Sequence, residues 1–182
     1  MGKKEKRTTP AQIIQKRRQN ILINRGYVSL FFRIGLIAFC SWLLLSQVFL
    51  LTQNSGTDMV PSMKDGDLVV AYRLQKDYAK GDVIVYEVDG KQHVGRIIAR
   101  GTDVVTMDDS GTLLVNGTAQ GGEIIYPTYA KEGMEYPYKV PENAVFVLGD
   151  YRTEATDSRD FGPVPMEDVK GKVITILRRR SL

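Results

Sequence analysis

Two side chains in the stretch "GTDMVPSMKDGD", residues 56–67, are candidates for chemistry on a peptide bond. Ser62 carries a hydroxyl, and Asp58, four residues earlier, carries a carboxylate. A serine hydroxyl attacks an amide only when a neighbouring base takes its proton. A carboxylate is a weak nucleophile, and the chemistry of aspartic proteases requires two carboxylates that share a proton. Either residue therefore needs a partner elsewhere in the chain.

Few partners for metal or triad chemistry are present. His93 is the only histidine and Cys40 the only cysteine, so we expect no metal site and no cofactor. A Ser-His-Asp triad would have to use His93, which we interpret instead as a residue on the surface of a strand. Cys40 lies in an apolar run and is expected to pack there. The sequence contains no zinc-type or phosphate-binding motif, and we expect no nucleic-acid partner.

A membrane anchor is predicted before these residues. The run Ile34–Leu51 holds 18 uncharged residues, about the minimum that crosses a hydrocarbon core. A buried soluble helix or a cleaved signal peptide are the alternatives, but the following "TQNSGTD" lacks a small-residue cleavage pattern. We therefore place a transmembrane helix within residues 30–53.

Charge predicts the orientation of the anchor. The basic residues that precede the apolar run are Lys3, Lys4, Lys6, Arg7, Lys16, Arg17, Arg18, Arg25 and Arg33. The positive-inside rule then gives a single-pass protein of the cell membrane, with a cytoplasmic tail (1–29) and an extracellular domain (54–182). Thr9-Pro10 suits the start of a short basic amphipathic helix that lies on lipid, with a disordered tail as the alternative.

The outer domain is predicted to be mostly β and antiparallel. Its β-branched segments, separated by turn residues, are 67–74, 82–88, 91–99, 103–107, 112–120, 144–150 and 172–179. Asn116-Gly117 suits a type I′ hairpin turn. Residues 118–142 form a more irregular part with no repeating pattern.

Four motifs in this domain carry a resemblance. They are "KGDVIVYEV" (80–88), "GRIIARGTD" (95–103), "LLVNG" (113–117) and "FVLGDYRTEATDSRDFGPVP" (146–165). They resemble, in the same order, the boxes of type I signal peptidases (S26-like), which are membrane-bound serine proteases that remove signal peptides with a Ser/Lys dyad. The resemblance covers roughly residues 30–175 and implies a signal-peptidase-like antiparallel β domain.

The resemblance also assigns positions to the opening stretch. The family's nucleophilic serine lies eight residues before a Gly-Asp pair, here Gly66-Asp67, and that position holds Asp58. The family's lysine base would precede Arg96, where this chain has Gly95. A hydroxyl residue that orients the lysine is replaced by Ala155. The resemblance therefore predicts no catalytic residue at these degenerate positions, and Ser62 does not fit the spacing.

Other residues of the boxes match the family. The cleft and scaffold positions that we carry over are Met59, Pro61, Arg96, Gly149, Asp150, Asp157, Ser158 and Arg159. Among them, Asp157 is expected to form a salt bridge with Arg159.

These substitutions favour a non-catalytic protein, and we expect no enzyme. The Asp-for-Ser and Gly-for-Lys pair resembles the SipA-type (also called LepA-type) accessory proteins of streptococcal pilus assembly. This implies a chaperone-like factor whose partners are the membrane, pilin subunits and a pilin-polymerising sortase. Two alternatives stay open. One is an active membrane peptidase with an unorthodox site, built on Asp58 with Asp157 or on Ser62 with Lys64; the other is a signal-peptide-binding regulator.

Overall fold

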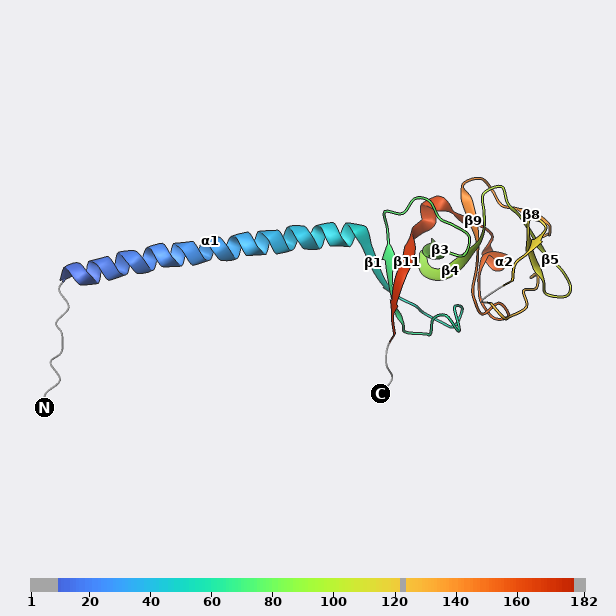
Figure 1. Cartoon of the computed structure of the whole chain (residues 1–182), viewed down its shortest axis with the longest axis horizontal. Coiled ribbons are helices and arrows are strands. Elements are labelled where there is room, and N and C mark those ends of the chain that lie inside the picture. Colours follow the sequence, from blue (N-terminus) through green and yellow to red (C-terminus); the bar gives the residue numbers. More distant parts are fainter. Residues whose placement is uncertain (1–9, 122–123, 179–182) are drawn as a thin grey trace, which may run out of the picture. The chain divides into compact units, whose positions relative to one another are not determined.

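The computed structural model describes residues 10–121 and 124–178, with side chains from residue 25 onward. The chain forms two units that divide between Ser46 and Gln47. The first contains nearly all of helix α1 (Pro10–Val48), which runs without a break (Figure 1). A helix begins at Pro10 as predicted, but it is not the short separate helix expected, because it continues through the apolar run to Val48. Thr9 and the basic residues before it lie outside the described residues.

Helix α1 includes a segment, Arg25–Val48, that is long and apolar enough to cross a membrane. The large side chains of this segment, such as Phe31, Phe32 and Leu44, are exposed within the chain itself. An exposed apolar helix of this length is typical of a membrane span.

The end of the apolar run differs from the expectation. We placed the span at residues 30–53, but α1 ends at Val48 and β1 (Phe49–Gln53) follows directly. Strand β1 pairs antiparallel with β2, with Phe49 opposite Tyr72 and Gln53 opposite Leu68. Hydrophobicity alone does not separate a membrane helix from an adjoining strand, so the run Ile34–Leu51 belongs partly to each element.

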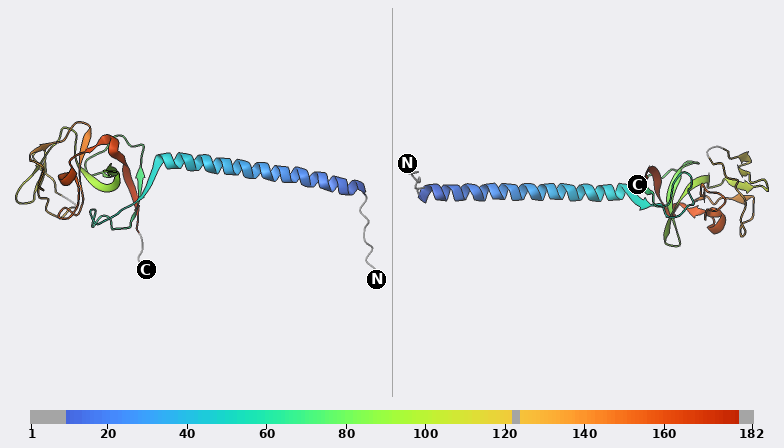
Figure 2. Two further views of the ribbon diagram at one scale, coloured as in Figure 1. Left: turned by 180° about the vertical axis from the view of Figure 1, so that it is seen from behind. Right: turned by 90° about the horizontal axis from the view of Figure 1, so that it is seen from below.

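A seven-stranded antiparallel sheet forms the body of the second unit, in the order β1-β2-β11-β3-β4-β9-β10. Its remaining strands are β2 (Leu68–Tyr72), β3 (Val83–Val88), β4 (Lys91–Arg100), β9 (Ala144–Leu148), β10 (Val164–Pro165) and β11 (Val169–Leu177). Strand β11, near the end of the chain, lies between β2 and β3, and Figures 1 and 2 show it within the sheet in red. The expected mostly β, antiparallel fold is confirmed.

A smaller four-stranded sheet has the order β7-β6-β5-β8. Its strands are β5 (Val104–Met107), β6 (Leu113–Val115), β7 (Thr118–Ala119) and β8 (Tyr138–Lys139). The predicted hairpin turn is present, because Asn116 and Gly117 both have positive φ, 54° and 77°. Most of 118–142 is irregular, as expected, although it contributes two short strands; residues 122–123 lie outside the described residues.

Three buried clusters hold the two sheets and their connections together. One joins the smaller sheet to β9 through Val105, Leu113 and Phe146, and a second packs Ile84 and Ile97 against Val147. The third contains the short segment that follows β1. A four-residue helix, α2 (Ser158–Phe161), and a turn of 3₁₀ helix, η1 (Met166–Asp168), complete the domain.

Candidate functional site

Asp58 lies in the loop between β1 and β2, and the base of this loop is closed by hydrogen bonds. The N–H of Asn54 donates to the carbonyl of Asp67 at 2.8 Å, and the N–H of Gly66 donates back to the carbonyl of Asn54 at 2.9 Å. The buried Asn54 side chain also donates to the carbonyl of Lys64 at 3.1 Å. These contacts satisfy buried polar groups and fix the path of the loop.

The segment 149–156 holds Asp58 from the other side. The N–H of Tyr151 donates to the Asp58 carbonyl at 2.9 Å, and the N–H of Thr156 lies 3.4 Å from Asp58 Oδ1. A Cβ atom at Gly149 would lie 2.6 Å from the Asp58 carbonyl oxygen and 2.3 Å from the Ala155 Cβ atom. Two of the positions singled out by the resemblance, Asp58 and Ala155, therefore meet at Gly149.

The half-buried Asp58 side chain lines a small hollow between β1 and β4. The hollow is lined by Thr52, Gln53, Asn54, Ser55, Asp58, Val85, Gln92, His93 and Val94. The Thr52 hydroxyl donates to Gln92 Oε1 at 2.9 Å across it. Most of these groups are polar, so the hollow is suited to hydrogen-bonding groups.

Burial raises the pKa of Asp58, and a contribution from Asp157 acts in the same direction. The N–H of Thr156 and the charges of His93 and Lys131 oppose this shift. The net effect is a carboxylate that has lost water without gaining a full ion pair. Such a carboxylate is ready to accept hydrogen bonds from a ligand.

His93 is half-buried and not simply on the strand surface as expected. Its ring stacks on the buried ring of Tyr86 with centroids 5.7 Å apart, and Phe161 lies 6.3 Å away. His93 thus brings the one histidine of the chain to the hollow that contains Asp58. This position could not be predicted, because strand periodicity alone does not tell which face of β4 is covered.

Gly95 is the residue on β4 directly after Val94, the last β4 residue that lines the hollow, and it pairs with Ile84 on β3. A Cβ atom there would lie 2.5 Å from Val147 Cγ1 and 3.2 Å from the Tyr86 ring. Close packing of the neighbouring strands therefore fills the place that a side chain would need. Gly95 brings no titratable group to the hollow.

Ser62 lies apart from this hollow. It lines a different one, together with Met63 and residues of β11, and its hydroxyl donates to Asp150 Oδ2. Asp150 is fully buried and also accepts from Arg96, at 2.8 Å from Nε and 2.7 Å from Nη2. The structure therefore places Ser62 on a buried ion pair, and not beside Asp58.

The predicted salt bridge between Asp157 and Arg159 is present and buried. Arg159 donates to both carboxylate oxygens, from Nε at 2.9 Å and from Nη2 at 2.8 Å. The N–H of Gly149 adds a third bond to Asp157 at 3.1 Å, and Ser158 Oγ accepts from the N–H of Val147 at 2.9 Å. Asp157 is thus occupied by structural contacts, which disfavours it as an acid partner of Asp58.

The two remaining predicted cleft residues are placed differently. Met59 is completely buried and packs with Met63, Val69 and Val85, so it belongs to the core. Pro61 follows a cis peptide bond and is exposed. Of the two, only Met59 packs in the core, where it holds the loop that contains Asp58.

Lys131 is a residue of the site that sequence reasoning missed. Its ammonium donates to the carbonyl of Ala155 at 2.7 Å and pairs with Asp160 at 2.8 Å. It belongs to the irregular part of the chain, where no motif marks it. Only the fold brings this cation to the segment that holds Asp58.

Comparison with known proteins identifies the family. Residues 25–177 match the family described as signal peptidase, peptidase S26. The thylakoidal processing peptidase 2 of Arabidopsis thaliana, described as probable, is 32% identical over 132 residues, which are 65% of this chain and 35% of that protein. The signal peptidase I of Bacillus licheniformis is 30% identical over 134 residues, which are 64% of this chain and 69% of that protein.

Two further similarities complete the comparison. The thylakoidal processing peptidase 1 of Arabidopsis thaliana is 30% identical, and the match spans 65% of this chain and 39% of that protein. This chain therefore spans little more than a third of the length of either Arabidopsis relative. The crystal structure of a signal peptidase I from Enterococcus faecalis is 30% identical, with a TM-score of 0.44 over 54% of this chain and 97% of that chain.

The expectation that this chain is not an enzyme is contradicted by these findings. It rested on Asp58, Gly95 and Ala155, but the relatives at 29–32% identity are named signal peptidases or processing peptidases, which are enzymes.

The anchor agrees with the relatives. The exposed apolar helix together with the signal peptidase I relatives indicates association with a membrane. Since the family match extends from that helix to the last strand, residues 25–177, the chain belongs to the signal peptidase family, peptidase S26.

Proposed function

We propose that this protein is anchored in the cell membrane and holds an extended segment of an exported polypeptide beside Asp58. The observation that carries the proposal is the half-buried Asp58 carboxylate, whose pKa is raised by burial, in a polar hollow between β1 and β4. A desolvated carboxylate gains free energy when a ligand supplies an N–H group or a cation.

The position of the hollow suits an extended ligand. Strand β1 contributes Thr52 and Gln53 to the hollow and is an edge strand of the seven-stranded sheet. An edge strand offers backbone N–H and C=O groups to which an extended peptide adds as a further strand. The hollow has a volume of about 10 Å³, so it admits one small polar group of that peptide beside Asp58.

The partner class follows from the resemblance to SipA-type accessory proteins. We propose that the exported polypeptides are pilin subunits and that the protein acts with a pilin-polymerising sortase. The basic residues before the apolar helix favour a cytoplasmic N-terminus and an extracellular β domain.

Deletion of the gene tests this role. In the deletion strain, immunoblots of cell-wall extracts should lose the high-molecular-weight ladder of pilin polymers, and the wild-type gene should restore it. Asp58→Lys should fail to restore the ladder, because the new cation repels the N–H groups or cations that donate hydrogen bonds to the carboxylate. Asp109→Lys, the same substitution at an exposed position, is the matched control and should restore the ladder. An unchanged ladder in the deletion strain would contradict the pilus role.

Peptide-bond cleavage is the second candidate, favoured by the peptidase names of the relatives. The purified full chain in detergent micelles is incubated with an exported precursor. Release of a shortened product that is lost with Asp58→Ala would support cleavage at this hollow. Loss with Ser62→Ala instead would assign the reaction to the other hollow.

A further inference from the structure

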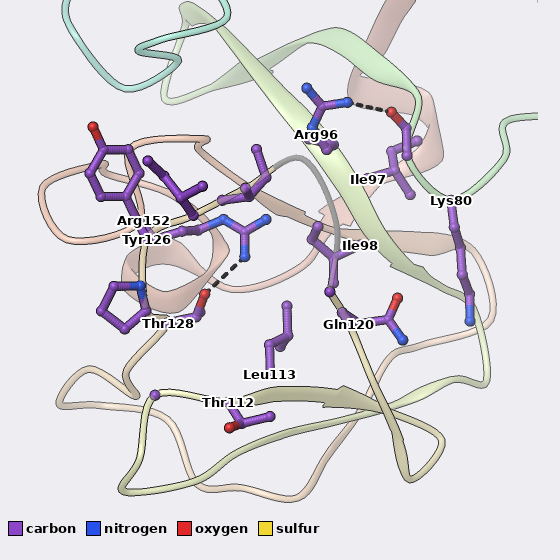
Figure 3. A pocket seen from close by; sticks show the side chains of 16 residues that line it. Lys80, Arg96, Ile97, Ile98, Thr112, Leu113, Gln120, Tyr126, Thr128 and Arg152 are labelled. Carbon is purple, nitrogen blue, oxygen red and sulfur yellow. Dashed lines mark hydrogen bonds between the residues drawn. The ribbon is translucent and has the colours of Figure 1, made fainter.

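A third hollow, of about 470 Å³, lies on the smaller-sheet side of the domain. Its walls come from β4, β6 and residues 120–121 and 124–128, with Arg152 at one side (Figure 3). It shares no lining residue with the hollow that contains Asp58.

Arg152 is the unusual group in this hollow. Its side chain is 96% buried, since the residue is 4% exposed, and Figure 3 shows its guanidinium group directed into the hollow. Nε donates to the carbonyl of Gly149 at 2.8 Å, and Nη1 donates to the Thr128 hydroxyl at 2.9 Å. Both acceptors are neutral. Within residues 25–121 and 124–178, no carboxylate lies within ion-pair distance of Arg152.

The other cations of the hollow differ from Arg152 in this respect. Lys80 pairs with Asp103 at 3.2 Å, and Arg96 pairs with Asp150 at 2.7 Å. None of the 16 lining residues is acidic. Burial lowers the pKa of Arg152 to about 10, which still leaves the group positively charged at neutral pH. A buried cation without an anion is costly, and an anionic ligand offsets that cost.

Apolar side chains make up part of the remaining lining, beside the polar residues Thr112, Gln120 and Thr128. Ile98 and Leu113 are buried at the floor, and Ile124, Ile125 and Tyr126 form one wall. Tyr126 also packs on Tyr151, with ring centroids 5.0 Å apart, which fixes the wall next to Arg152. A ligand for this hollow therefore combines one negative charge with an apolar body.

We propose that this hollow binds a carboxylate on an apolar group, with Arg152 as its cationic anchor. A guanidinium group recognises a carboxylate by paired hydrogen bonds, and the apolar wall contacts the carbon chain beside it. The carboxylate has two possible peptide sources: the free C-terminus of a chain, or an acidic side chain with apolar neighbours.

Binding of small probes to the full chain in detergent micelles tests this proposal. The probes are N-acetyl-leucine, which mimics a C-terminus, N-acetyl-glutamate α-amide, which mimics an acidic side chain, and the uncharged N-acetyl-leucine amide. Binding is followed by the NMR signal of the Arg152 Nε–H group. The first or second probe should shift this signal in a saturable way, and the amide should bind at least about tenfold more weakly, the typical worth of a charged hydrogen bond.

Two variants that each add a carboxylate, Gln120→Glu and Asn143→Asp, keep the test independent of folding, unlike a substitution of Arg152 itself. Arg152→Gln removes the charge but also disturbs the bonds to Gly149 and Thr128. Gln120→Glu, at an exposed lining residue, adds a carboxylate to the hollow and should weaken probe binding while Arg152 is intact. Asn143→Asp adds the same charge at an exposed residue outside the hollow and should leave binding unchanged. Equal binding of the amide and the acids, no binding of any probe, or equal effects of the two added charges would overturn the proposal.

Discussion

The Asp58 carbonyl accepts a hydrogen bond from the Tyr151 N–H at 2.9 Å, which joins two loops that are more than 90 residues apart in the chain. The contact is possible because Gly149, two residues before Tyr151, has no side chain. The loop after β9 therefore determines where Asp58 lies.

Gly149→Ala should displace Asp58. The added Cβ atom would meet the Asp58 carbonyl oxygen at 2.6 Å and Ala155 Cβ at 2.3 Å, and neither neighbour is a flexible chain end. We expect a loss of about 1–3 kcal/mol in the free energy of unfolding, as for other overpacked sites, measured by urea titration with circular dichroism. Gly121→Ala is the control, since a Cβ atom there lies within 4 Å of no atom in the part of the chain that the structure describes. Equal stability of the two variants would show that the loops do not pack as described.

Gly95 and Val147 should be energetically coupled. A Cβ atom at Gly95 would lie 2.5 Å from Val147 Cγ1, so Gly95→Ala should cost about 1–3 kcal/mol. Val147→Ala removes the colliding methyl groups. The double variant should therefore lose less free energy of unfolding than the two single variants lose together, with a difference of about 0.5–3 kcal/mol. Strictly additive losses in urea titrations would argue against this packing.

Ser62→Ala should reduce stability only slightly and leave ligand binding at Asp58 unchanged. The Ser62 hydroxyl donates to Asp150, which keeps its bidentate pair with Arg96 when the hydroxyl is removed. We expect a loss of about 0.5–1.5 kcal/mol, the net worth of one hydrogen bond. A complemented deletion strain that carries Ser62→Ala should form a normal pilin ladder. Loss of the ladder from a stably produced variant would place Ser62 in the functional site.

Asp58 should lower the stability of the domain at neutral pH. Because burial raises its pKa in the folded state, the folded protein holds the proton more tightly than the unfolded chain. The contribution of Asp58 to stability therefore falls as pH rises from the unfolded pKa through the raised folded pKa. Asp58→Asn should have a higher Tm than the wild type at pH 7, and the difference should shrink toward pH 4. Thermal scans at several pH values measure this difference in Tm, with Asp109→Asn as the control. A Tm difference that grows on acidification would show that the pKa of Asp58 is lowered in the folded state, and not raised.

Much of the fold was predictable because the strands alternate in hydrophobicity and are separated by turn residues. All seven predicted strand segments contain a strand, and the Asn116-Gly117 turn has the positive φ values that the pair favours. Strand β1 was missed because its apolar residues continue the pattern of the membrane helix. The short strands β8 and β10 carry too few residues for a periodic signal.

Only the site residues that belong to a recognised motif could be predicted from the sequence. The buried Asp157–Arg159 pair was predicted from the spacing of one box. Lys131 and His93 reach the same region through tertiary packing, which no local pattern encodes. Membership of a peptidase family likewise came from comparison, and it corrected an inference drawn from three substituted positions.

Photo-crosslinking from the hollow tests most directly whether an exported polypeptide is held beside Asp58. A photoreactive amino acid replaces Gln92, an exposed residue that lines the hollow, in cells that produce the full chain. The same amino acid at Asn143, exposed and outside the hollow, is the control. Illumination should join position 92 to a pilin subunit, position 143 should give no such product, and Asp58→Lys should abolish the product from position 92. Crosslinking to pilin that persists with Asp58→Lys, or that is equal from both positions, would contradict the account.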